Sequence, residues 1–222
     1  MRLIAHRGWS EASGSDNTLA AFARAAADPR VSGVEIDVCR DDAGTLLVSH
    51  DPPRGDAPTL TLDAALGYLA GTELELFVEL KQTGIAGAAI EALVAAGVAE
   101  RSVVFAFAEI ARCFPWSAAR PVRLGAILLY PWTMRRFIAA YHPDLILLGW
   151  DECRQPWSRL AFRAWWSVFR LARVTQRSGK PVAVGVVRRP GDLRWLARRN
   201  PYASIADMDV IDGRQGSAAP QS

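Results

Sequence analysis

Cysteine is scarce in this sequence. Its 222 residues include three cysteines, Cys39, Cys113 and Cys153, and no two of them form a CxxC pair. This wide spacing excludes a disulfide framework and a zinc knuckle. We therefore interpret the three cysteines as buried thiols.

Long apolar runs are also absent. The apolar stretch in the opening Met-Arg-Leu-Ile-Ala-His-Arg-Gly is far too short for a signal peptide or a membrane span, so we expect a cytoplasmic protein. The net charge of +3 is modest, and the basic residues accompany no recognised nucleic-acid reading motif. No nucleic-acid partner is expected.

Short apolar runs alternate with helical patterns along the whole chain, which is typical of βα units and a parallel sheet. Eight strands are predicted, over residues 3–6, 33–39, 74–80, 102–107, 124–129, 145–150, 182–187 and 203–206. Seven helices are predicted between them, over residues 17–27, 62–70, 86–99, 110–118, 134–141, 159–177 and 193–199.

This pattern predicts a (β/α)₈ TIM barrel of nearly minimal length, whose closing helix is short or missing. We assign residues 1–212 to a single domain and residues 213–222 to a disordered tail. The turn-forming residues Asp41 to Gly44 predict a hairpin that extends the second strand.

Acidic side chains mark the second and third predicted strands. Glu35 and Asp37 are two residues apart, so both carboxylates project from one face of their strand, toward the barrel interior. Glu79 repeats this arrangement on the next strand. Because such carboxylates repel one another, they favour a divalent cation such as Mg²⁺ or Ca²⁺. An ion-pair network with Arg7 and Lys81, without a metal, is the alternative.

Two of the three histidines lie beside these acids. His6 ends the first predicted strand and His50 ends the hairpin, whereas His142 lies apart from them. Histidine exchanges protons near neutral pH, so two histidines on opposite sides of a phosphate could activate a nucleophile and protonate a leaving group.

In this order, His6-Arg7-Gly8, Asn17-Thr18, Glu35-x-Asp37, His50-Asp51 and Glu79-x-Lys81 resemble the motifs of the glycerophosphodiester phosphodiesterase family. The resemblance is strong over roughly the first 81 residues and looser up to Ala206-Asp207. It implies a (β/α)₈ barrel that hydrolyses glycerophosphodiesters to glycerol phosphate and an alcohol.

The resemblance also implies a role for each motif residue. A divalent metal, Mg²⁺ or Ca²⁺, would be bound by Glu35, Asp37 and Glu79. His6 and His50 would be the acid and base. The substrate would be bound by Arg7, Asn17 and Lys81, of which Arg7 and Lys81 would hold phosphate oxygens.

The sequence departs from the family pattern at several places. Asp16 replaces a glutamate, and it could serve instead as a helix cap. Arg188 stands where an amide is usual, near a strand end that lacks the usual tryptophan. Only 28 residues separate His50 from Glu79, so we expect a more open pocket that admits larger or membrane-held substrates.

Arginine and tryptophan are concentrated in residues 157–180. On a helical wheel five arginines form one stripe that includes Trp166 and is expected to face solvent: Arg159, Arg163, Arg170, Arg173 and Arg177. This combination predicts a possible peripheral contact with an anionic membrane. The alternative is an ordinary barrel helix kept soluble by its arginines.

Three functions therefore remain open. The first is a metal-dependent hydrolase of glycerophosphodiesters. The second is a lyase that releases the head group of a lysophospholipid or sphingolipid and forms a cyclic phosphate. The third is a barrel that binds a phosphate or a membrane without catalysis.

Overall fold

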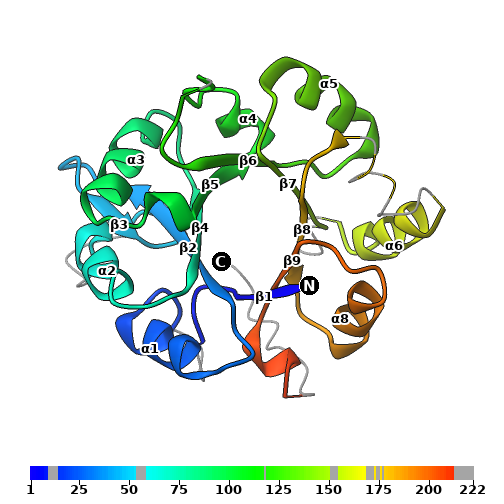
Figure 1. Ribbon diagram of the computed structural model, residues 1–222, viewed down its shortest axis with the longest axis horizontal. Helices are drawn as coiled ribbons and strands as arrows, with labels where there is room; N and C mark the ends of the chain where they lie inside the picture. Colours follow the sequence, from blue (N-terminus) through cyan, green and yellow to red (C-terminus); the bar gives the residue numbers. More distant parts are fainter. Residues whose placement is uncertain are drawn as a thin grey trace.

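The structure is a computed structural model, which describes residues 1–9, 15–53, 59–117, 119–150, 155–168, 173, 176 and 178–212. Eight parallel strands close into a barrel in the order β1-β9-β8-β7-β6-β5-β4-β2, with β2 returning to pair with β1 (Figure 1). They are β1 Arg2–Ala5, β2 Gly33–Arg40, β4 Glu75–Leu80, β5 Ser102–Phe107, β6 Arg123–Ile127, β7 Leu145–Leu148, β8 Val182–Val187 and β9 Ala203–Ala206. All eight predicted strands, and the predicted barrel, are confirmed.

The predicted hairpin is also present. β3, Leu46–Val48, pairs antiparallel with the end of β2, with Val48 opposite Val38. Because β3 runs back along β2, it returns the chain to the level of Asp37, whose carbonyl accepts a hydrogen bond from the Ser49 amide.

Helices surround the barrel (Figure 1). They are α1 Leu19–Ala27, α2 Leu62–Leu69, α3 Ala86–Ala95, α4 Ala108–Ala111, α5 Pro131–Tyr141, α6 Ser158–Val168 and α8 Pro190–Ala197, with a 3₁₀ turn at Ala99–Arg101. After β9 the described part of the chain has only a 3₁₀ turn, Met208–Val210, so the closing helix is reduced as predicted. The predicted tail, residues 213–222, lies outside the described residues.

Two helices differ most from their predicted bounds, and the other five differ by one to four residues at an end. The helix predicted over 110–118 ends at Ala111, and Pro115, which lacks an amide donor and clashes with the preceding turn, prevents its continuation. The helix predicted over 159–177 begins at Ser158 and is continuous to Val168. Beyond that, the described residues 173, 176 and 178 are helical.

The predicted solvent-facing position of Trp166 is wrong. Trp166 and Phe162 are both buried, and they pack with Trp195 of α8 and with the outer face of the barrel. The side chains of Arg159 and Arg163 are directed toward α8, where they contact the buried carboxylate of Asp192 at 3.0 and 3.1 Å. The sequence pattern failed here because the acid that pairs with these arginines, Asp192, lies on the neighbouring helix α8.

The interpretation of the cysteines is correct in part. Cys39 is buried on β2, whereas Cys113 is exposed after the short helix α4. Cys153 lies outside the described residues. The early end of α4 leaves Cys113 without a helix to cover it.

Two apolar layers hold the barrel together. The larger layer lies between the strands and the helices, and the smaller one fills the barrel interior with residues such as Ile4, Phe77, Phe105 and Leu147. Phe77 and Phe105 meet edge to face on adjacent strands. This packed interior makes the barrel a rigid support for the groups at its two ends.

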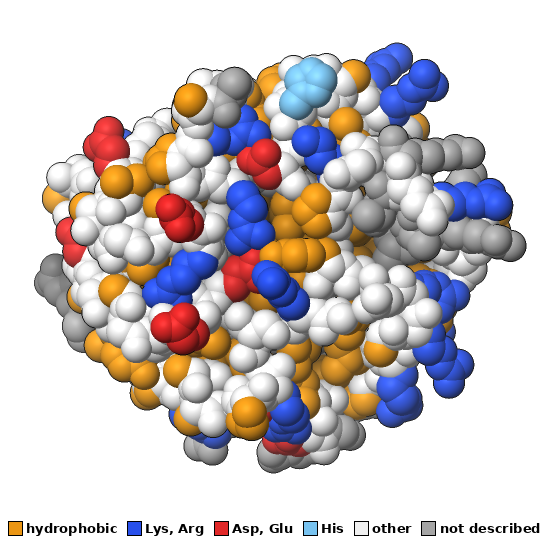
Figure 2. All heavy atoms as spheres, in the orientation of Figure 1, with side chains coloured by type: hydrophobic (Ala, Val, Ile, Leu, Met, Phe, Trp, Pro, Cys, Tyr) orange, Lys and Arg blue, Asp and Glu red, His pale blue; other side chains and the backbone are white. Residues whose placement is uncertain are grey.

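The amino end of the barrel, where the strands begin, is closed by a cluster of ion pairs. The buried Glu75 carboxylate contacts Arg2 and Arg123 and accepts a hydrogen bond from the Tyr202 hydroxyl at 2.6 Å. Figure 2 shows acidic and basic side chains side by side over the centre of the barrel. No helix of the described residues is long and apolar enough to cross a bilayer.

Candidate active site

The predicted site residues lie where parallel strands end, at the carboxyl end of the barrel. His6 follows β1, Glu35 and Asp37 lie on β2, and Glu79 and Lys81 lie at the end of β4. The register pairs Asp37 with Glu79 on the adjacent strand, which places the two carboxylates side by side. Parallel pairing thus brings together Asp37 and Glu79, which are 42 residues apart along the sequence.

A tight turn after β1 aims the main chain at this cluster. Arg7 and Gly8 have positive φ angles of 53° and 79°, and a Cβ atom at Gly8 would lie 2.9 Å from Ala21. Glycine is therefore required there, because a side chain would collide with α1. The turn directs the Arg7 amide to Glu35 Oε2, at 3.0 Å.

The three carboxylates form one compact group. Glu35, Asp37 and Glu79 each offer an oxygen, and these oxygens all lie within 4.8 Å of one another. Glu35 and Asp37 are 1% and 0% exposed, so little water can screen their charges. Such a group requires compensating positive charge.

Two cations supply part of that charge. Lys81 Nζ lies 2.7 Å from both Asp37 Oδ1 and Glu79 Oε1, and Arg7 Nε lies 2.7 Å from Asp37 Oδ2. Burial alone would raise the pKa of Asp37, but the charges of Lys81 and Arg7 outweigh burial and lower it. Burial opposes the charge of Lys81, but the carboxylates prevail and raise its pKa.

Asn17 is tied to the same carboxylate. Its Nδ2 donates to Asp37 Oδ2 at 3.0 Å, and its Oδ1 accepts from the Asp37 amide at 3.3 Å. Asn17 adopts a positive φ of 56°, which asparagine tolerates better than most residues. Both ends of its amide are therefore engaged with Asp37.

Among the described residues, the one basic side chain at ion-pair distance from Glu35 is His6, whose Nε2 is 3.8 Å away. Its Oε2 accepts the Arg7 amide, while Oε1 is buried without a hydrogen-bond partner. Burial, and then repulsion by Asp37 and Glu79, raise the pKa of Glu35 well above its ordinary value. The predicted ion-pair network therefore forms around Asp37 but leaves Glu35 uncompensated.

These residues fit a divalent metal. The donor set is three carboxylates with oxygens close together, as Mg²⁺ and Ca²⁺ prefer. An orphaned buried oxygen on Glu35 is what a missing ligand bond would leave. The two cations do not offset three negative charges.

His6 is held by an acid that the sequence reading did not assign. Its Nδ1 lies 2.8 Å from Oδ1 of Asp207, which directly follows β9. Burial favours a higher pKa for Asp207, but the hydrogen bond and charge of His6 lower it. The available signal was positional, because Asp207 is the first polar residue after a strand of the barrel.

The remaining predicted residues lie around this centre. His50 follows the hairpin strand β3, one residue after Ser49, which bonds the Asp37 carbonyl. Its Nδ1 is 3.1 Å from the exposed Asp51, and its side chain is one-third exposed. Arg188 approaches Asp207 at 3.5 Å.

Asp16 pairs with Arg7 at 3.6 Å and does not cap α1. The cap is Thr18, whose hydroxyl accepts from the Ala21 amide. Residues 54–58, in the short segment between His50 and α2, lie outside the described residues.

No family model and no curated protein matches the chain. Solved structures do match it over nearly its whole length. A glycerophosphodiester phosphodiesterase from Parabacteroides distasonis shares 16% identity at a TM-score of 0.71, covering 95% of both chains. One from Agrobacterium tumefaciens shares 20% identity at 0.68, covering 93% of this chain and 96% of that one.

A third similar structure carries a ligand. It is a phosphodiesterase from Oleispira antarctica in complex with the product sn-glycerol-3-phosphate, with 17% identity, a TM-score of 0.68 and coverage of 96% and 97%. This chain has the fold of the glycerophosphodiester phosphodiesterases. The fold agrees with the resemblance carried by the sequence motifs, and it places the carboxylate cluster at the end of the barrel where TIM-barrel enzymes hold their active sites.

Proposed function

We propose that this protein is a metal-dependent phosphodiesterase that hydrolyses glycerophosphodiesters to glycerol phosphate and an alcohol. The observation that carries the proposal is the group of three buried carboxylates with an orphaned oxygen, beside a histidine that is oriented by an acid. The product bound to the Oleispira antarctica enzyme, which has the same fold, supports this substrate class.

His6 is suited to proton transfer through one defined nitrogen. Because the ionised Asp207 can only accept, Nδ1 of His6 carries the proton in that hydrogen bond. Nε2 is then free to take up or release a proton on the side of Glu35. Asp207 acts through His6 and is a positioning residue.

Hydrolysis requires a second proton-transferring group. One histidine removes a proton from the attacking water as its oxygen bonds to phosphorus, and the other protonates the alcohol oxygen as its bond to phosphorus breaks. His50 is the candidate for this partner, because the hairpin returns it to the level of Asp37.

Arg7 and Lys81 serve the phosphate as well as the carboxylates. Each has donors beyond those engaged with Asp37 and Glu79, and both side chains keep slight exposure, at 13% and 14%. Asn17, whose amide is engaged at both ends, holds Asp37 in place.

A divalent cation, Mg²⁺ or Ca²⁺, held by Glu35, Asp37 and Glu79 would offset the charge of the phosphodiester and complete the neutralisation of Glu35. Lys81, in contact with both Asp37 and Glu79, would hold its ammonium ion beside this metal site.

The lyase remains the second candidate. In that reaction a hydroxyl of the substrate attacks phosphorus in place of water and leaves a cyclic phosphate, while the same histidines move the protons. ³¹P NMR of the products distinguishes the two reactions, because a cyclic phosphodiester and a phosphate monoester have different chemical shifts.

The decisive experiment measures glycerophosphocholine hydrolysis with Mg²⁺, Ca²⁺ or EDTA. We expect turnover with a divalent metal, none in EDTA, and a loss of about 10²- to 10⁴-fold in His6→Ala. His142→Asn is the matched control, because asparagine tolerates the positive φ of 47° at the end of α5. Turnover in EDTA that survives loss of His6 would refute the proposal, and binding without turnover would favour a non-catalytic barrel.

A further inference from the structure

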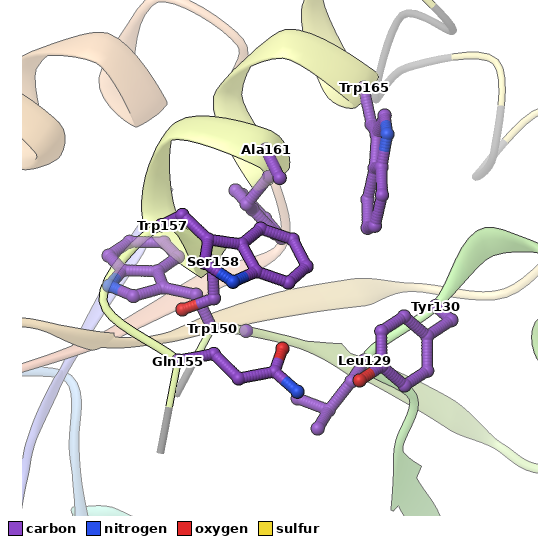
Figure 3. Close-up of a pocket in the computed structure, with 10 residues that line it drawn as sticks. Leu129, Tyr130, Trp150, Gln155, Trp157, Ser158, Ala161 and Trp165 are labelled. Atoms are coloured by element: carbon purple, nitrogen blue, oxygen red, sulfur yellow. The ribbon is translucent and has the colours of Figure 1, made fainter. Parts of the chain in front are cut away.

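Aromatic side chains gather at the ends of β6 and β7. Tyr130 and Trp132 stack with ring centroids 4.8 Å apart, and Trp165 of α6 meets Trp132 edge to face at 5.6 Å. Trp157 lies at the start of α6 on the same side (Figure 3). The catalytic proposal uses none of these residues.

Several apolar side chains at this place face solvent. Trp132, Trp157 and Leu160 are 64%, 55% and 62% exposed, and we call these three residues the aromatic rim. Exposed apolar side chains that cluster, unlike scattered ones, mark a surface that meets a partner.

The rim lies toward the carboxyl end of the barrel. Trp132 is the second residue of α5, and Trp157 immediately precedes α6. Each helix of the barrel begins near the end of the strand before it, here β6 and β7. The rim therefore opens on the same end of the barrel as the carboxylates and His6.

An apolar cavity of about 120 Å³ lies behind the rim. Its described lining includes Tyr130, Trp150, Trp157, Phe162 and Trp165, and no charged side chain (Figure 3). In the close-up, Trp165 projects from α6, and Trp157 from the residue just before it, on the side that faces Tyr130. Trp157 belongs to both the rim and the cavity lining, and Trp132 of the rim stacks on Tyr130 of the lining.

The sequence that follows Trp157 is mostly basic. Between residues 155 and 199 the sequence has eleven Arg and Lys residues and one acid, Asp192, which is buried against Arg159 and Arg163. Arg159, near the start of α6, and Arg189, directly before α8, lie at the same end of the barrel as the rim, because each of these helices begins near the end of a strand. A partner at this surface is therefore anionic.

We propose that the aromatic rim is the surface by which the protein binds an anionic lipid membrane, and that its phosphodiester substrates are lipids drawn from that membrane. Tryptophan is favoured at the membrane interface, and adjacent arginines attract anionic head groups. A second copy of the chain is a poorer partner, because its own basic flank would repel this one. The substrate class rests on the proposed phosphodiesterase function, whereas membrane binding does not.

Vesicle co-flotation tests the binding surface. The full chain is compared on phosphatidylcholine vesicles and on vesicles that also contain phosphatidylglycerol. We expect binding to the anionic vesicles, weakened about tenfold or more in the Trp132→Ala/Leu160→Ala double variant. Tyr68→Ala, which removes an exposed aromatic from α2, is the matched control and should bind as the unmodified chain does.

The outcomes separate this proposal from the proposed function. Membrane binding by the rim is refuted if the protein does not bind anionic vesicles or if the double variant binds them equally well. It is also refuted if size-exclusion chromatography shows a dimer that the double variant converts to a monomer. The substrate class is tested by the ratio of lysophosphatidylglycerol to glycerophosphocholine turnover, which should fall about tenfold in the double variant. Vesicle binding by a protein that hydrolyses neither compound would sustain the rim and refute the phosphodiesterase.

Discussion

The two ends of this barrel both bury acidic side chains, yet they balance them differently. At the amino end, Glu75 alone faces Arg2, Arg123 and the Tyr202 hydroxyl. At the carboxyl end, three carboxylates share Arg7 and Lys81, and one oxygen of Glu35 has no partner. Both carboxylate oxygens of Glu75 have partners in the first cluster, whereas one carboxylate oxygen of Glu35 in the second has none among the described residues.

This difference shows that a buried carboxylate without compensating groups can indicate a ligand site. A buried carboxylate is stable only where hydrogen bonds and counter-charges replace its hydration. Glu75 meets this condition within the chain itself. Glu35 does not meet it within the described part of the chain, and this is the observation on which the proposed metal at this end is based.

The largest expected effect comes from Glu35→Gln. We expect a loss of metal-dependent turnover of about 10³-fold or more, because a carboxylate ligand is replaced by a neutral amide. Without metal the variant should be as stable as the unmodified chain or melt roughly 2–4 °C higher, because an uncompensated buried charge is gone. Melting curves in EDTA and initial rates in Mg²⁺ measure both effects. A variant that keeps metal-dependent turnover and is less stable in EDTA would contradict the conclusion that Glu35, unlike Glu75, is not compensated by its neighbours.

A smaller loss is expected for Asp207→Asn. An amide in place of the carboxylate no longer fixes the proton on Nδ1 of His6, so kcat should fall about 10²-fold while KM changes little. The pH–rate profile separates this from a structural defect, since the limb assigned to His6 should shift. If kcat and KM change together with no shift in the profile, Asp207 has only a structural role.

At the amino end, Glu75→Gln should lower stability and leave catalysis intact. Removing the carboxylate leaves Arg2 and Arg123 facing each other, and because both keep contact with water we expect a cost of about 1–3 kcal/mol in the free energy of unfolding. Urea denaturation measures the stability, and turnover per folded molecule measures the activity. A loss of turnover would show that the two ends are coupled.

The smallest effect concerns pH in the metal-free protein. The raised pKa of Glu35 means that above its ordinary value of 4.5 the native state keeps a proton that the unfolded chain releases. The stabilisation that Glu35 contributes is therefore fully present below pH 4.5. It is lost as the pH rises toward the raised pKa, by at most about 1.4 kcal/mol in the free energy of unfolding per pH unit. The lowered pKa of Asp37 acts oppositely, and only at acid pH.

Melting temperatures in EDTA between pH 5 and pH 8 test this sign. The unmodified chain should lose more stability over this range than Glu35→Gln, since the variant has no proton to release at that position. Parallel curves for the two proteins would mean that Glu35 does not titrate in this window.

Much of the fold could be predicted from the sequence. Apolar runs bounded by turns gave all eight strands, because each strand is local and bounded by residues that cannot continue it. The helix over 110–118 failed for a local reason too, since Pro115 was present in the sequence and was underestimated.

The site was predicted less evenly. The i, i+2 spacing of Glu35 and Asp37 fixed their common face, and strand pairing placed Glu79 beside them. The contact of Asp207 with His6 was not predicted, because residues more than 200 positions apart become neighbours only when the barrel closes. The burial of Trp166 was not predicted either, because a helical wheel shows which residues share a stripe but not what packs against them.

By itself, then, the sequence determined the order of strands and helices, the chemical types at the strand ends and the common face of Glu35 and Asp37, since these follow from local periodicity. Only the tertiary structure decided which charges are compensated. Glu75 gains two arginines and a tyrosine from distant strands, while Glu35 gains one amide hydrogen bond and keeps an unpaired oxygen. That balance depends on distances of a few ångströms between remote segments, and pairing across the closed barrel sets those distances.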